Sequence, residues 1–92
     1  MTQDTNALLL DRAKSHGDFR VQFAIDQSLK NICREYMGPN THTAVQVTVI
    51  EMICHKLSRV LCGDPGFADH WDDIAGYAKL ASKEIALGTS PS

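Results

Sequence analysis

The sequence lacks an excess of charge of either sign and has no long apolar run. Nine lysines and arginines stand against eleven aspartates and glutamates, which gives a formal net charge of −2. General electrostatic binding of DNA or RNA requires a basic surface, so we exclude general nucleic-acid binding as the function. No apolar run approaches the roughly 18 residues of a membrane span. The start of the chain also lacks the basic segment followed by an apolar segment that is typical of a signal peptide. We therefore expect a soluble cytoplasmic protein without a membrane partner.

Cysteines and aromatic residues are also few. Cys33, Cys54 and Cys62 are odd in number and form no C-x-x-C pair, which predicts reduced thiols in a cytosolic protein. Aromatic residues make up 7% of the chain and are too dispersed to form a platform for stacking nucleic-acid bases. The sequence also has no P-loop and no dinucleotide-binding fingerprint.

What is present is the composition of one small globular domain. The chain has 92 residues and is 43% hydrophobic, enough for one modest core and no second one. Glycine falls beside turn-forming residues at three joints, 16–18, 38–41 and 63–66, and the last two joints also contain proline. We expect a single all-α domain over 1–92, with frayed ends at 1–3 and 88–92.

The apolar spacing between these joints is helical. It predicts a small four-helix bundle with helices at 4–15, 18–37, 43–61 and 69–87. Residues 43–49 alternate and are rich in β-branched side chains, which favours a strand by propensity. A helix is the better prediction there, because the apolar residues beyond continue at helical spacing and a lone strand would have no partner.

Two of these helices show an apolar stripe that we expect to face the core. In the second helix the stripe comprises Val21, Ile25, Leu29, Ile32 and Tyr36. In the fourth helix it comprises Trp71, Ile74, Ala75, Ala78, Ala81 and Ile85.

The third helix has a polar face opposite its apolar arc. Glu51, His55 and Arg59 follow one another at i, i+4 and i+8, and Lys56 lies at the border of the arc. One interpretation is a solvated face with a helical ion pair. The other is that these side chains line a cleft or the surface of a second subunit.

The fourth helix places His70, Asp73 and Tyr77 on the flank of its buried stripe, while Asp69 points toward solvent. A half-buried carboxylate such as Asp73 requires a cation, a metal ion or hydrogen-bond donors. The alternatives are a functional carboxylate and a structural ion pair with a lysine or arginine of the third helix.

The first joint combines cations with a helix start. Arg12 and Lys14 precede a Gly turn, and Asp18 opens the next helix. This arrangement is able to cradle a phosphate, because helix N-terminal amides attract anions. The alternative is a glycine helix stop followed by an aspartate cap.

Three segments together resemble a known family. They are R-x-K-x-H-G-D-F (12–19), E-M-I-C-H-K-L-S-R-V (51–60) and G-D-P-G-F-A-D-H-W-D-D-I-A-G-Y-A (63–78). The chain is similar to an uncharacterised family of small phage and prophage proteins. That family in turn resembles the MazG-like all-α nucleoside triphosphate pyrophosphohydrolases, including their nucleotide-modification-associated branch.

The resemblance implies a helical bundle, usually dimeric or tetrameric, in which acidic residues bind Mg²⁺ and the ion holds a nucleotide triphosphate. Glu51 and Asp73 match acids of the two metal-binding helices and would be the catalytic residues. Lys56 and Arg59 match phosphate contacts. His70 stands where the superfamily usually has a glutamate, and His55 lies near another such position. Mn²⁺ is a possible substitute for Mg²⁺, because it accepts nitrogen ligands more readily.

Two functions are therefore expected as alternatives. One is a metal-dependent hydrolase that converts a nucleoside triphosphate to its monophosphate and pyrophosphate. The other is a non-catalytic phage protein that sequesters a nucleotide or second messenger, or that binds a host protein. The candidate metal ligands are Glu51, His55, Asp69, His70 and Asp73. The candidate nucleotide-binding residues are Arg12, Lys14, Asp18, Lys56, Arg59 and Tyr77.

Overall fold

The computed structural model describes residues 18–88, which form three α-helices and no strand. These are α2 (Phe19–Tyr36), α3 (Ala44–Cys62) and α4 (Ala68–Ala86). The all-α prediction is confirmed for this part of the chain. The helix predicted at 4–15, which would complete a four-helix bundle, lies outside the described residues, as do the predicted frayed residues 1–3 and 89–92. None of the helices in the described range is long and apolar enough to cross a membrane.

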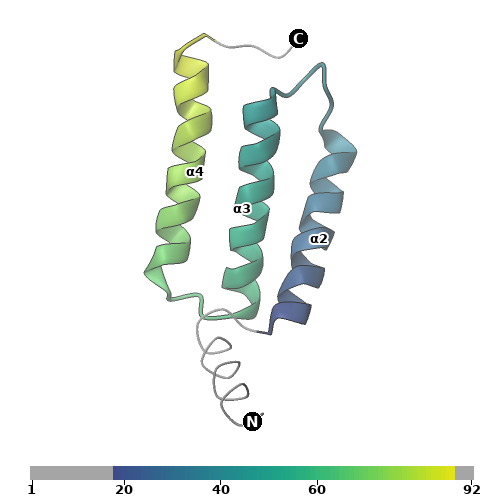
Figure 1. The fold of residues 1–92 in the computed structure, drawn as a ribbon, viewed down its shortest axis with the longest axis vertical. Helices are drawn as coiled ribbons and strands as arrows, with labels where there is room; N and C mark the ends of the chain where they lie inside the picture. The colour runs from purple at the N-terminus through teal and green to yellow at the C-terminus, as the bar shows by residue number, and fades with distance from the viewer. Residues whose placement is uncertain (1–17, 89–92) are drawn as a thin grey trace, which may run out of the picture.

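The three helices lie side by side with α3 in the middle (Figure 1). Consecutive helices run antiparallel, and α3 packs against α2 on one side and α4 on the other. The described fold therefore has two helix interfaces, and α3 contributes one side of each.

Side-chain caps fix where α2 and α3 begin. Asp18 is the N-cap of α2, as predicted, and its Oδ1 accepts a hydrogen bond from Arg20 N at 2.8 Å. Thr43 and Gln46 form a reciprocal capping box at the start of α3, with Gln46 N to Thr43 Oγ1 at 3.1 Å and Thr43 N to Gln46 Oε1 at 3.0 Å. This box explains why the β-branched segment after residue 43 is helical rather than extended.

The two joints within the described range are hydrogen-bonded turns. In the first, the amides of Thr41 and His42 both donate to Gly38 O, at 3.1 and 3.0 Å. In the second, Asp64 Oδ1 accepts from Gly66 N at 2.8 Å. Trp71 reaches back to this joint, where its Nε1 donates to Pro65 O at 2.7 Å. That bond keeps the indole at the surface, 48% exposed.

The interior of the described fold is more polar than the sequence suggests. Its buried apolar residues are Val49, Cys54 and Val60. Its buried polar residues are Gln22, Asp26, Thr43, Ser58 and His70.

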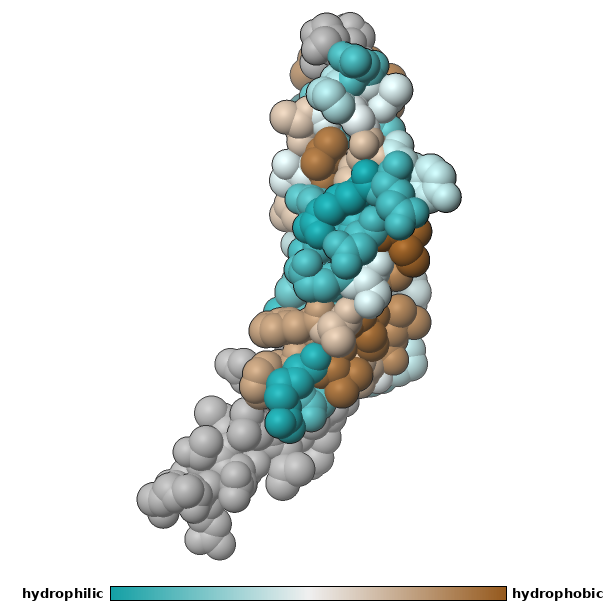
Figure 2. All heavy atoms as spheres, turned by 90° about the vertical axis from the view of Figure 1, so that its right-hand side faces the viewer, coloured by the Kyte–Doolittle hydropathy of each residue, from teal (hydrophilic) through white to brown (hydrophobic). Residues whose placement is uncertain are grey.

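The predicted buried stripe of α2 is wrong in part, because Ile25 and Leu29 are half-buried as predicted but the other three residues are exposed. Val21 and Ile32 are more than half exposed, and Tyr36 is 79% exposed. Gln22 and Asp26 are buried in their place. Gln22 contacts Ser58 and Asp26 lies beside His55, so these two polar residues of α2 face α3. Figure 2, which views the outer side of α2, shows apolar atoms gathered toward the lower part and one edge of the described residues.

The face that α4 turns toward α3 is rotated relative to the predicted apolar stripe. Trp71, Ala75, Ala78 and Ile85 are exposed, whereas Ile74 and Ala81 remain partly buried as predicted. The residues turned toward α3 include the polar flank of the stripe. His70 is buried, and Asp73, Tyr77 and Glu84 are half-buried.

Candidate functional site

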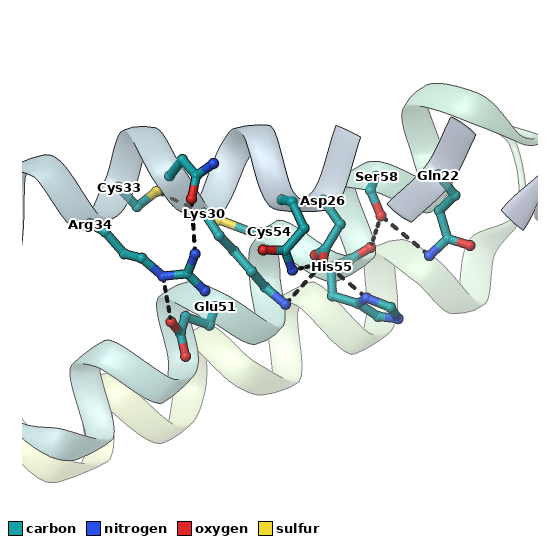
Figure 3. A network of polar contacts seen from close by, with 11 residues as sticks. Gln22, Asp26, Lys30, Cys33, Arg34, Glu51, Cys54, His55 and Ser58 are labelled. Carbon is teal, nitrogen blue, oxygen red and sulfur yellow. Dashed lines mark hydrogen bonds and ion pairs between the residues drawn. The ribbon is translucent and has the colours of Figure 1, made fainter. Parts of the chain in front are cut away.

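A buried carboxylate, Asp26, is the centre of a polar network between α2 and α3 (Figure 3). Asp26 is only 5% exposed. Lys30 lies one helical turn further along α2, and its Nζ is 3.0 Å from Asp26 Oδ2. Gln27 Nε2 donates to the same oxygen at 3.3 Å. On the other side, His55 Nδ1 of α3 is 3.5 Å from Asp26 Oδ1.

A second buried contact lies beside this carboxylate. Gln22 Nε2 donates to Ser58 Oγ at 3.3 Å, and Ser58 Oγ donates to the backbone oxygen of His55 at 2.5 Å. Ser58 is 0% exposed. Because its hydroxyl is enclosed and already donates to the backbone, Ser58 serves the helix contact and is not placed to act as a nucleophile.

Burial and the nearby cations disfavour the protonated form of His55. Burial lowers the pKa of His55, and the charge of Arg59 lowers it further, although the Asp26 carboxylate opposes both effects. The ring turns Nδ1 toward the Asp26 carboxylate of α2, 3.5 Å away, without a hydrogen bond to Oδ1. The ring is therefore oriented by α2, and its side chain stays 35% exposed.

Glu51 also contacts α2. Its Oε2 is 3.5 Å from Arg34 Nε, and Arg34 Nη1 donates to Asn31 Oδ1 at 3.0 Å. The solvated-face interpretation of Glu51 and His55 is thus wrong, because both side chains pack on the neighbouring helix. The sequence reasoning missed Asp26, Lys30 and Arg34, although the i, i+4 spacing of Asp26 and Lys30 is typical of a helical ion pair.

The other interface, between α3 and α4, has its own cluster of charges. Lys56 Nζ lies 2.7 Å from Asp73 Oδ2, and the Lys56 side chain is only 13% exposed whereas that of Asp73 is 46% exposed. The hydrogen bond from Lys56 lowers the pKa of Asp73, and the charges of Lys56, His70 and Arg59 add to the effect. The structure therefore provides the lysine of the third helix that one sequence interpretation expected for Asp73.

The remaining residues of this interface differ in accessibility. Arg59 is half-buried, and its buried Nε has no hydrogen-bond partner within the described part of the chain. His70 is 1% exposed, and its ring meets Phe67 edge-on with centroids 4.9 Å apart. Tyr77 is half-buried, one turn beyond Asp73 on α4. We name Lys56, Arg59 and Asp73 the α3–α4 charge cluster.

Other predicted site residues lie apart from this cluster. Asp69 is exposed in the first turn of α4. Asp18 caps α2 with its own carboxylate, and the backbone hydrogen bond from Arg20 lowers its pKa. Arg12 and Lys14 lie outside the described residues.

The predicted metal ligands do not gather around one point in the described chain. Glu51 pairs with Arg34 at the α2–α3 interface, and Asp73 pairs with Lys56 at the α3–α4 interface. Over residues 18–88 no group of three or more His, Cys, Asp or Glu side chains is placed to hold a metal ion. Because Mg²⁺ requires several oxygen ligands in near-octahedral geometry, this donor set does not fit the ion within residues 18–88 of one chain.

Comparison with known proteins gives a family without an assigned activity. No curated protein and no solved structure matches the chain. A family model described as a domain of unknown function matches residues 1–85, which includes all three described helices. The chain therefore belongs to the family of the domain of unknown function DUF6378.

Proposed function

We propose that this protein binds the phosphate groups of a nucleotide, or of a nucleotide-derived messenger, at the α3–α4 charge cluster. One observation supports the proposal above the others. Two cationic side chains of α3, Lys56 and Arg59, act on a single carboxylate of α4, Asp73. The cluster therefore has a surplus of positive charge at an interface where burial weakens solvent screening.

The donor chemistry of the cluster suits a phosphate. The Lys56 ammonium has three hydrogen-bond donors and directs one of them to Asp73 Oδ2. The Arg59 guanidinium offers a fork of donors that matches phosphate oxygens. In this proposal Asp73 positions Lys56 and is not itself a phosphate ligand. Tyr77, half-buried one turn away, is the candidate contact for the nucleoside.

The same proposal includes hydrolysis of the nucleotide, on the condition that a metal site forms. The resemblance to MazG-like pyrophosphohydrolases implies an acidic Mg²⁺ or Mn²⁺ site, and one chain does not assemble it in the described range. A second copy of the chain is the natural source of further carboxylates. We propose a homo-oligomer for this reason, and because α2 exposes large apolar side chains.

The binding test is a melting-temperature titration with each common NTP and dNTP, without metal and then with Mg²⁺ or Mn²⁺. A ligand that binds only the folded state raises the melting temperature by mass action. We expect a rise in the wild type that is lost in Lys56→Gln and Arg59→Gln. Lys79→Gln, at an exposed position of α4, is the matched control and should keep the rise.

Turnover is measured in the same samples as pyrophosphate release. Release that requires added metal would support the hydrolase, and a temperature rise without release would support a sequestering protein. If no nucleotide changes the melting temperature of the wild type, the proposal fails and binding to a host protein becomes the leading alternative.

A further inference from the structure

Two cysteines of neighbouring helices face each other next to the Asp26 network. Cys33 Sγ of α2 lies 3.6 Å from Cys54 Sγ of α3 (Figure 3). A disulfide requires the two sulfurs to approach to about 2.05 Å, so the remaining movement is roughly 1.5 Å. We propose that Cys33 and Cys54 are an oxidation site at which an intramolecular disulfide joins α2 to α3.

The two thiols differ in exposure, as a stepwise oxidation requires. Cys33 is half-buried, whereas Cys54 is 4% exposed. Burial raises the pKa of Cys54 to about 11, and the neighbouring Cys33 contributes to the increase. Because Cys33 is the more exposed of the two thiols, it meets an external oxidant first. Cys54 then acts as the resolving thiol, and its burial protects it from that oxidant.

The oxidant in this proposal is a small soluble disulfide of the glutathione class. The Cys33 thiolate attacks one sulfur of that disulfide, forms a mixed disulfide and releases one small thiolate. Cys54 loses its proton to solvent and attacks Cys33 Sγ, which forms the internal disulfide and releases the second small thiolate. The two released thiolates take up the protons that Cys33 and Cys54 gave to solvent. The two protein thiols are oxidised by two electrons, and the small disulfide is reduced to two thiols.

The bond would lock an interface that is otherwise made of polar contacts. The charges of Asp26 and Lys30 act directly on Cys54, so the disulfide would form beside the ion pair that positions His55. It would close the loop of chain between residues 33 and 54, which includes the joint at 38–41. A closed loop of this length restricts the unfolded chain and stabilises the fold.

The test is equilibration of the purified full-length protein with oxidised and reduced glutathione, followed by intact mass and non-reducing peptide mapping. We expect a mass loss of two hydrogen atoms and one linked peptide pair that contains Cys33 and Cys54. The oxidised protein should melt roughly 10 °C or more above the reduced protein. Reduction with dithiothreitol should reverse both changes.

Three variants complete the experiment. Cys62→Ser is the matched control, because Cys62 is a half-buried cysteine on α3 outside the pair, and it should keep the full response. Cys33→Ser and Cys54→Ser should both lose it. Cys33→Ser alters a half-buried position and keeps the test valid if Cys54→Ser fails to fold. The proposal is overturned if the oxidised wild type retains three thiols, carries only glutathione adducts, or links only different chains.

Discussion

Asp26 lies in the interior of the fold without the complete set of partners that a buried carboxylate usually has. Its Oδ2 contacts Lys30 and Gln27, but its Oδ1 has no hydrogen bond in the described chain and is 3.5 Å from His55. A buried ion pair offsets its desolvation cost only while both partners are present. The stability of the α2–α3 interface therefore depends on this one charge.

Replacing Asp26 by asparagine tests that dependence. Asp26→Asn keeps the shape of the side chain but leaves the Lys30 ammonium, 17% exposed, without its counter-charge. We expect the free energy of unfolding to fall by about 2–4 kcal/mol. Urea denaturation measures the change, and Asp72→Asn, at an exposed position, should stay within about 0.5 kcal/mol of the wild type. Equal stability of the two variants would contradict the account of Asp26.

His55 predicts a dependence of stability on pH. Burial, and then the charge of Arg59, lowers the pKa of His55 from its ordinary value of 6.5. The unfolded chain then binds the His55 proton more tightly than the folded chain does. The free energy of unfolding should accordingly fall as the pH decreases from about 6.5 toward the folded-state pKa, and His55 should have no effect above that window.

Urea denaturation of the wild type and of His55→Gln at about pH 7.5 and about pH 5.5 measures the contribution of His55 to the pH dependence of the free energy of unfolding. We expect the wild type to lose more stability than the variant over that interval. A smaller loss in the wild type would mean that the Asp26 carboxylate controls the protonation of His55 and raises its pKa.

At the scale of the element, the capping box of α3 contributes measurably to the free energy of unfolding. Thr43 accepts a hydrogen bond from Gln46 N, and its hydroxyl also donates to Glu84 Oε1 of α4 at 2.6 Å. Thr43→Ala removes both bonds and should lower the free energy of unfolding by about 1–2 kcal/mol. Thr43→Ser retains the hydroxyl and should recover most of that loss. Chemical denaturation of the two variants is the measurement, and equal losses would show that the methyl group rather than the hydroxyl matters.

The positions of the helices could be predicted from the sequence because local signals determine them. Apolar residues at helical spacing define α2, α3 and α4, and glycine and proline mark the joints at 38–41 and 63–66. The contact between Asp73 and a lysine or arginine of the third helix was one of two alternatives, because helical spacing placed Asp73 on the flank of the buried stripe.

The direction in which each helix faces could not be predicted in the same way. Val21 and Gln22 are neighbours on α2, and periodicity alone favours burial of the valine. The structure buries the glutamine, because Ser58 of α3 provides a hydrogen-bond partner across 36 positions of sequence. Glu51 is a second example, because its ion-pair partner Arg34 belongs to the preceding helix. Such pairings depend on which helices become neighbours, and the period of a single helix contains no information about that.

At the scale of the whole molecule, the described helices form a layer whose outer helix α2 exposes large apolar side chains. Phe19, Val21 and Phe23 are each about half exposed, at 52%, 52% and 51%, and Ile32 is 59% exposed. Figure 2 shows apolar atoms gathered on this side of the molecule beside a polar band. Apolar patches rimmed by polar residues typically mark surfaces at which proteins associate.

We predict that a second copy of the chain covers this surface, so the protein should sediment as a dimer or a higher oligomer at micromolar concentration. Val21 and Ile32 lie on one stripe of α2, at i and i+11, and a charge there would have to be buried on association. Val21→Glu combined with Ile32→Glu should therefore shift the sedimentation coefficient to that of the monomer while the far-UV circular dichroism stays helical. Lys79→Glu adds a negative charge at an exposed position of α4 and should leave the oligomer intact. A wild type that sediments as a monomer at every concentration would show that no second copy occupies the surface, and the carboxylates needed for a shared metal site would then have to come from elsewhere in the same chain.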